Sequence, residues 1–363
     1  MYMDRIETLI GREPTLPNMQ MLQAPILNKS VLVTGAGGSI GSELCRQIIK
    51  LQPRILILVE RTEFFLYSIY SKLQNINSNI NIVPLLADIN DRDRIEEIFS
   101  RWNVDIVFHT AACKHVPIVE SNPLEGIENN VFGTINCAQI AVNHGVKQFV
   151  FISTDKAVNP TSVMGATKRL CEIILQSMNK HNKTKFTIVR FGNVLGSSGS
   201  VVPLFEKQIK EGGPVTVTDL ETDRYFMSIL EASQLLIQAA ALSRGGEIFL
   251  LDMGQPIKII DLAKRMIKLM KGDHKHIEIK ITGMRPGERI HEQLLINNTS
   301  IATLHPKIFI ADDKFNDEKL QLKLERLYNS VKARDREQSL MVLKSCVPEY
   351  SYQTPSVDWV TKN

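Results

Sequence analysis

Three consecutive residues at the end of an apolar segment have side chains that could carry out acid–base chemistry. Thr154, Asp155 and Lys156 follow residues 147–153, which we predict to form a buried strand. A protonated carboxyl group can donate a proton, and an amine can accept one if burial or a neighbouring cation lowers its pKa. The threonine hydroxyl can hydrogen-bond a substrate oxygen. A surface ion pair of little energetic consequence would also explain Asp155 and Lys156, but their place at a strand end favours the chemical interpretation.

Two further candidate residues follow this triplet in the sequence. Met164 and Lys168 are one turn apart on a predicted helix over 162–181, so their side chains share one face. Lys168 would bring a positive charge to the same site. Met164 has no titratable proton, so it can be neither acid nor base, and a lone methionine on a helix is usually a core residue.

A glycine-rich loop joins the first predicted strand (30–34) to the first predicted helix (39–50). A glycine at position 35 permits a tight turn, one at 38 lets the backbone approach a pyrophosphate, and one at 41 lets the helix pack closely on the strand. The helix N-terminus then faces the phosphates. This context predicts a dinucleotide site, to which we assign Thr34, Gly35, Gly37, Gly38, Ser39, Ile40 and Gly41.

The carboxylate of Glu60, at the end of the second predicted strand, suggests which dinucleotide is bound. A carboxylate there accepts both ribose hydroxyls and repels a 2′-phosphate, which favours NAD over NADP. Arg61 argues in the other direction, because an arginine can hold a 2′-phosphate. Asp88, after the third predicted strand, could hydrogen-bond the adenine amine or simply cap a helix. We also assign Ile89, Ala111 and Ala112 to this site.

Apolar strands that alternate with helices must position all these residues. The pattern predicts an α/β fold with a doubly wound parallel Rossmann sheet and a smaller C-terminal α/β substrate domain. We expect an N-terminal extension over 1–28, an NAD-binding domain over 29–192 and 230–252, a substrate domain over 193–229 and 253–345, and a tail over 346–363.

Composition excludes several classes of protein. The chain has 363 residues, of which 44% are hydrophobic and 23% charged, so it can bury a large core. Its net charge of +4 is too small and dispersed to predict a nucleic-acid partner. Five widely spaced cysteines without a CxxC motif predict neither a disulfide framework nor a zinc site, and we expect no metal. We find no apolar stretch long enough to span a membrane and no signal peptide, and therefore expect a cytoplasmic protein.

Several segments together resemble one known family. They are TGAGGSIG, STDKAVNP, MGATK, RFGNVLGSSGSVVPLF, RYFM and RPGE. From about Gly11 to Tyr350 the chain resembles the extended short-chain dehydrogenase/reductase superfamily, and within it the UDP-N-acetylglucosamine 4,6-dehydratases. The superfamily has a tyrosine where this chain has Met164. One branch, the membrane-anchored capsule and glycan enzymes, also has methionine there, and the segment LIGREPTLP resembles the one that precedes their catalytic domain. The tyrosine branch inverts C5, and the methionine branch is expected to retain its configuration.

The resemblance implies a redox-neutral reaction. NAD takes a hydride from C4 of the sugar, the C5 proton and the C6 hydroxyl are eliminated, and the hydride returns to C6. It implies that Lys156 is the base at C5, Asp155 the acid at the C6 hydroxyl, and Thr154 a hydrogen-bond partner of the C4 oxygen. Lys168 would hold the nicotinamide ribose. Without the tyrosine, the C4 hydroxyl proton could pass to Asp155, to Lys156 or to water through Thr154.

The resemblance also implies a substrate site. It places Asn193 against the substrate, Arg224 and Arg285 on the UDP diphosphate, and Lys114 near the nicotinamide and the sugar. Glu288 is a further substrate candidate, whereas His291 is more typical of a packed residue. We expect UDP-N-acetylglucosamine and further copies of the same chain as partners. A UDP-sugar C4-epimerase and a non-catalytic NAD-binding protein are the alternatives. The Asp155–Lys156 pair and Met164 speak against the epimerase, and the missing tyrosine is the only support for the binding protein.

Overall fold

A nine-stranded sheet is the centre of the computed structural model, which describes Leu9, Gly11 and residues 15–76, 79–271, 277–296, 299–313 and 318–351. The remaining parts of the expected extension and tail, including 352–363, lie outside the described residues. The strand order is β14-β15-β11-β6-β5-β4-β1-β2-β3. The strands from β11 to β3 pair in parallel, whereas β15 and β14 are antiparallel. Their bounds are β1 Ser30–Thr34, β2 Ile55–Glu60, β3 Asn81–Leu86, β4 Ile106–His109, β5 Gln148–Ile152, β6 Lys185–Arg190, β11 Ile248–Leu251, β14 Ser300–Ala302 and β15 Ile308–Ala311.

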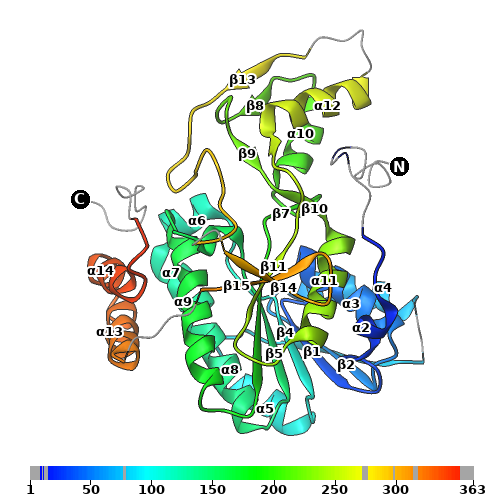
Figure 1. Ribbon diagram of the computed structural model, residues 1–363, viewed down its shortest axis with the longest axis vertical. Coiled ribbons are helices and arrows are strands. Elements are labelled where there is room, and N and C mark those ends of the chain that lie inside the picture. Colours follow the sequence, from blue (N-terminus) through cyan, green and yellow to red (C-terminus); the bar gives the residue numbers. More distant parts are fainter. Residues whose placement is uncertain are drawn as a thin grey trace.

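Helices cover both faces of this sheet, as Figure 1 shows. Strands β1, β2 and β4 are buried along their whole length, which matches their continuous apolar sequences. One apolar core lies between the sheet and α5, α8 and α9, and a second between the sheet and α3, α4 and α11. The helices of this domain are α2 Met19–Gln23, α3 Ser39–Lys50, α4 Glu63–Gln74, α5 Arg92–Arg101, α6 Val116–Ser121, α7 Pro123–Ile127, the π-turn η2 Glu128–Phe132, α8 Gly133–Asn143, the 3₁₀ turn η3 Asp155–Ala157, α9 Val163–Asn179 and α11 Ile229–Leu242. The predicted doubly wound α/β fold is confirmed.

A smaller lobe lies beyond the carboxyl ends of the parallel strands (Figure 1). It has its own apolar core, in which Phe205 of α10 and Leu262 of α12 are fully buried. Leu9 belongs to the same core, and its carbonyl accepts a 2.9 Å hydrogen bond from Arg265. The elements are β7 Asn193–Leu195, α10 Val201–Lys210, β8 Val215–Val217, β9 Asp223–Arg224, β10 Phe226–Ser228, β12 Ile257–Lys258, α12 Ile259–Lys271 and β13 Ile279–Ile281.

The last part of the chain departs from the expected domain division. We predicted that 253–345 belongs to the substrate domain, but β14 and β15 extend the large sheet. Helices α13 (Leu320–Lys332) and α14 (Arg336–Cys346) then contribute to the core that surrounds α9. The buried side chains of Val347 and Tyr350, in the expected tail, join the same core. The pairing of distant strands decides this division, and local sequence patterns do not report it.

Candidate active site

The glycine-rich loop forms a cradle at the carboxyl end of β1. Gly35 has a φ of 63°, which glycine adopts without strain. Gly38 is the N-cap of α3, so the free amides of the first helical turn point into the loop. A Cβ at position 41 would lie 2.2 Å from the carbonyl oxygen of Gly35, so only glycine fits there. These features suit a dinucleotide pyrophosphate.

The acidic residue at the end of β2 faces this loop. One oxygen of Glu60 accepts a 3.1 Å hydrogen bond from the Gly37 amide, and the other accepts one of 3.1 Å from the Thr62 amide. Arg61 donates to the side chain of Asn129 at 3.3 Å. A pocket opens here, and the predicted cofactor residues that line it are Gly35, Gly38, Glu60, Arg61, Ile89, Ala111 and Ala112.

Two predicted cofactor residues have other contacts. The Thr34 hydroxyl is buried and lies 2.9 Å from Nδ1 of His109. Burial and the nearby Lys168 lower the pKa of His109 to about 3, so the imidazole is neutral and links β1 to β4. Asp88 accepts a 2.9 Å hydrogen bond from the Asn90 amide and lines a separate hollow with Arg61. The Thr34 hydroxyl therefore faces the protein interior, and Asp88 stabilises a turn.

A second pocket adjoins the first, since Thr110 and Ala112 line both. It brings together the strand-end residues, the two residues of α9 and the segment after β6. Gly165 of the MGATK motif allows α9 to start close to the triplet, because a Cβ there would lie 2.2 Å from the Lys156 carbonyl oxygen. The predicted residues that line this pocket are Ile40, Lys114, Thr154, Lys156, Met164, Lys168 and Asn193.

The triplet forms a connected polar chain. The Thr154 hydroxyl donates to Oδ1 of Asp155 at 2.8 Å. The Lys156 ammonium donates to the same oxygen at 3.0 Å and to Oδ1 of Asn193 at 3.3 Å. Asp155 is fully buried, and its Oδ2 has no hydrogen-bond partner among the described residues. Thus a hydroxyl, a carboxyl and an amine lie within proton-transfer distance of one another.

The two predicted residues of α9 lie beside this chain. Lys168 donates to the Ile152 carbonyl at 2.8 Å, and its Nζ is 4.4 Å from the centre of the Phe151 ring. Burial lowers the pKa of Lys168 to about 8. Met164 is 3% exposed and packs into the core around α9 while its remaining surface lines the pocket.

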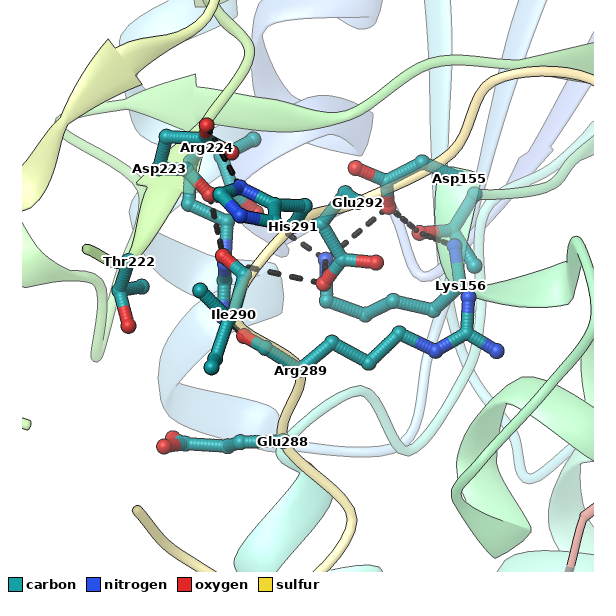
Figure 2. A network of polar contacts seen from close by, with 12 residues as sticks. Asp155, Lys156, Thr222, Asp223, Arg224, Glu288, Arg289, Ile290, His291 and Glu292 are labelled. Atoms are coloured by element: carbon teal, nitrogen blue, oxygen red, sulfur yellow. Dashed lines mark hydrogen bonds and ion pairs between the residues drawn. The ribbon is translucent and has the colours of Figure 1, made fainter. Parts of the chain in front are cut away.

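Arg224, which was predicted to bind the diphosphate, has several contacts within the protein. Its guanidinium donates to the carbonyl oxygens of Asp223 at 2.6 Å, Arg289 at 2.7 Å and Ile290 at 2.9 Å. These bonds fasten the segment after β13 to β9. Arg285 is exposed, and neither it nor Glu288 is among the residues that line the two pockets. Figure 2 shows the Glu288 side chain directed away from Lys156.

The sequence analysis missed Glu292, which reaches the triplet from the same segment (Figure 2). Its Oε1 lies 3.4 Å from Nζ of Lys156 and 3.6 Å from Nε of Arg224, and its side chain is 3% exposed. Burial lowers the pKa of Lys156, but Asp155 and Glu292 together outweigh it, and the pKa is raised. The base was expected to have a lowered pKa. No spacing in the sequence signals this contact, because the two residues are distant in the chain.

The loop after β7 completes the pocket wall. The Ser198 amide donates to the Ser39 hydroxyl at 3.0 Å, which joins this loop to the start of α3. His115 lies against Gly199, where a Cβ would be 2.4 Å from the imidazole. Burial lowers the pKa of His115 and of Lys114. The wall therefore carries backbone amides, hydroxyls and two basic side chains.

The sheet order and the glycine cradle define this chain as a Rossmann-fold protein. Residues 31–313 match the model of a family described as "Polysaccharide biosynthesis protein". The chain belongs to this family. The predicted resemblance is thereby confirmed at the level of the family.

Named relatives come from several bacteria. The chain is 51% identical to the capsular polysaccharide biosynthesis protein CapD of Staphylococcus aureus, over 83% of this chain and 50% of that protein. A UDP-N-acetylglucosamine 4,6-dehydratase (inverting) of Campylobacter jejuni is 32% identical over 76% of this chain and 80% of its own length. A UDP-glucose 4-epimerase of Rickettsia canadensis is 33% identical over 74% of this chain and 78% of its own length. The chain thus spans about half the length of CapD.

A solved structure agrees with the fold. Pen from Bacillus thuringiensis superposes with a TM-score of 0.73 at 35% identity, over 83% of this chain and 99% of that one. None of the helices within the described ranges has the length and apolar character needed to cross a membrane.

Proposed function

We propose that this chain is an NAD-dependent UDP-N-acetylglucosamine 4,6-dehydratase that retains the configuration at C5. The observation that carries the proposal is the position of Thr154, Asp155 and Lys156. Thr154 and Lys156 line the pocket that adjoins the dinucleotide cradle, and the buried Asp155 is hydrogen-bonded to both. A 4,6-dehydratase needs an acid, a base and a hydride acceptor around one sugar ring, and this juxtaposition supplies the first two beside the site for the third.

When bound, NAD supplies the two hydride transfers, from C4 of the sugar and back to C6. Gly35, Gly38 and Glu60 would hold it, and Lys168 at the far end of the cradle would hold the nicotinamide ribose. The chain's own residues handle the protons. The two side chains, joined by a 3.0 Å hydrogen bond, act as a neutral amine on Lys156 and a carboxylic acid on Asp155. The elimination requires this pair.

The proton balance closes within the triplet. The Lys156 amine takes the C5 proton, and the Asp155 acid gives its proton to the C6 hydroxyl, which leaves as water. That acid forms earlier: as the hydride leaves C4, the C4 hydroxyl proton passes through Thr154 to the Asp155 carboxylate, which the Thr154 hydroxyl contacts at 2.8 Å. Lys156 then returns its proton to C5 as the hydride arrives at C6. Because the same amine removes and returns the proton, the C5 configuration is retained.

A UDP-sugar C4-epimerase is the competing function, and the named epimerase among the relatives is consistent with it. An epimerase moves a hydride from C4 and back to C4, so it needs no acid at C6. The role proposed for the buried Asp155, an acid at the C6 hydroxyl, is not needed in that reaction. This favours the dehydratase.

One experiment separates these functions. The chain is incubated with NAD and UDP-N-acetylglucosamine in deuterium oxide, and the product is followed by proton NMR. We expect a 4-keto-6-deoxy sugar with deuterium at C5 and the original C5 configuration. A C4 epimer without loss of water identifies the epimerase, inversion at C5 rejects the proposed retention, and unchanged substrate with bound NAD identifies a non-catalytic binding protein.

Two variants test the assignment of the base. Lys156→Ala should abolish exchange of the C5 proton, whereas transient NADH absorbance from the first hydride transfer persists. Met164→Leu should cause only a small loss, because that side chain contributes shape and dryness to the pocket. If Lys156→Ala retains C5 exchange, the base lies elsewhere, and Lys114 in the same pocket is the first residue to test.

A further inference from the structure

We infer that Glu292 is a positioning residue of this active site, which holds the Lys156 ammonium against Asp155 and thereby sets the pH at which Lys156 can act as a base. The inference deepens the proposed function and rests on it only for its catalytic consequence. The effect of Glu292 on the protonation of Lys156 is a property of this chain alone and can be measured without substrate.

Glu292 and Lys156 approach each other from distant parts of the chain. Glu292 lies in the segment that follows β13, far in sequence from the triplet, yet its Oε1 is 3.4 Å from Nζ of Lys156. Asp155 approaches the same ammonium at 3.0 Å from η3. Lys156 is therefore bracketed by two carboxylates that belong to different parts of the fold, as Figure 2 shows.

Both carboxylates that contact Lys156 are buried. The side chains of Asp155 and Glu292 are 0% and 3% exposed. Each keeps one oxygen, Oδ2 and Oε2 respectively, without a hydrogen-bond partner among the described residues. A buried carboxylate needs a cation nearby, and in this site Lys156 serves both. Removal of its proton would take away the cation that the two buried carboxylates share and leave Glu292 with Arg224 alone, at 3.6 Å, so the charged ammonium is favoured.

The segment that carries Glu292 is fastened from two sides. Arg224 of β9 binds the carbonyls of Arg289 and Ile290 and lies 3.6 Å from Glu292. Arg289 donates to the Val158 carbonyl at 2.9 Å and to the Thr161 hydroxyl at 3.1 Å. Glu292 is thus held in place by contacts to both the small lobe and the large domain.

Charged groups from several elements act on the Lys156 ammonium. Asp155 and Glu292 favour the charged form of Lys156, whereas burial and Arg224 oppose it, and the balance raises the pKa. Two further titratable groups, Tyr225 and Arg289, interact with Asp155 or Glu292, and Asn193 is a neutral hydrogen-bond partner of Lys156. If Glu292 becomes neutral, a raising contribution is lost, so Lys156 gives up its proton at lower pH.

The test measures the protonation of Lys156 directly. The chain without substrate is labelled with a trace of acetic anhydride at pH values from 6 to 11, and the extent of labelling at each lysine is read by mass spectrometry. In the unchanged chain we expect the half-labelling pH of Lys156 to exceed that of exposed lysines such as Lys264. In Glu292→Gln the half-labelling pH of Lys156 should fall by about 1 pH unit, because the ammonium loses an opposite charge at this distance. Glu292→Asp, which keeps the charge, should restore part of this difference.

A matched control is Glu221→Gln. Glu221 lies just before β9, is exposed and pairs with Lys258 at 2.8 Å, so its loss should leave the Lys156 labelling curve unchanged. The inference is overturned if the curve is the same in Glu292→Gln as in the unchanged chain. It is also overturned if the half-labelling pH of Lys156 in the unchanged chain is lower than that of the exposed lysines. This outcome does not depend on whether any variant folds.

Turnover gives the second readout. If the proposed function holds, the acid limb of kcat for Glu292→Gln moves to lower pH together with the labelling curve, and activity at pH 6.5 rises about tenfold relative to its maximum. A change confined to KM with an unmoved pH profile assigns Glu292 a merely structural role and rejects the inference. A shifted labelling curve without any 4-keto product rejects the proposed function and leaves the inference standing.

Discussion

Arg190 of β6 and Glu172 of α9 form a two-point ion pair in the interior of the large domain. The distances are 2.7 Å from Nε to Oε1 and 2.6 Å from Nη2 to Oε2, and both side chains are 0% exposed. Ser153 donates to Oε1 of Glu172 at 2.7 Å. The pair therefore anchors the end of β5 directly before the candidate catalytic residues.

Glu172→Gln should strongly destabilise the fold, by about 3–5 kcal/mol, because it removes the two-point partner of a fully buried guanidinium, whose remaining carboxylate partner is Asp313. The urea midpoint of unfolding measures this. Glu125→Gln is the matched control, since Glu125 and Arg334 form an exposed pair at 2.6 Å that should contribute about 0–1 kcal/mol. Equal midpoints for the two variants would show that the buried pair adds nothing.

Gly41→Ala should abolish dinucleotide binding. Its Cβ would lie 2.2 Å from the Gly35 carbonyl oxygen and 2.8 Å from the Thr110 hydroxyl, so the cradle must open. Isothermal calorimetry with NAD tests this. Gly145→Ala provides the control: its Cβ meets nothing within 4 Å, although its φ of 69° costs some stability. NAD affinity that is unchanged in Gly41→Ala would remove the loop from the cofactor site.

Glu60→Ala should weaken NAD binding and relax the preference over NADP. The carboxylate lies at the pocket that Arg61 also lines, and its loss removes the group that repels a 2′-phosphate. Affinities for NAD and NADP, measured side by side in both proteins, report the change. A chain that already prefers NADP before the substitution would show that Arg61 decides the choice.

Arg224→Ala should loosen the segment that carries Glu292 and leave the dinucleotide cradle intact. The loss removes donors to three carbonyl oxygens, at 2.6, 2.7 and 2.9 Å. Hydrogen–deuterium exchange should become faster in peptides that cover 285–293 and stay unchanged in 30–50. Protection of both segments at the original level would contradict this structural role.

Lys168 should make the protein without cofactor more stable at alkaline pH. Its pKa in the folded state is about 8, below the 10.5 of a free lysine, so the unfolded chain binds more protons between these values. The free energy of unfolding therefore rises as the pH increases through this window, by at most roughly 3 kcal/mol. Urea unfolding at pH 7 and pH 10 measures the rise. Lys168→Met should reduce it, whereas the exposed Lys264→Met should preserve it.

Much of the fold was predictable because its signals are local. Continuous apolar strands such as 30–34 and 55–59 are typical of a parallel sheet that is buried on both faces. Glycine is required at 35, 38 and 41 by the backbone geometry of the loop, which the neighbouring residues form. The triplet at 154–156 was recognisable for the same reason, since its members are neighbours at a strand end.

The sequence by itself determined the Rossmann sheet, the position of the glycine cradle and the side chains able to move protons. Only the tertiary structure decided what those side chains contact. Arg224 was assigned to a phosphate, and the structure adds hydrogen bonds to backbone carbonyls that no spacing reports. Lys156 was expected to carry a lowered pKa, yet the distant Glu292 reverses the direction. Local patterns fix backbone conformation and burial, whereas electrostatic environment depends on groups that meet only when the chain has folded.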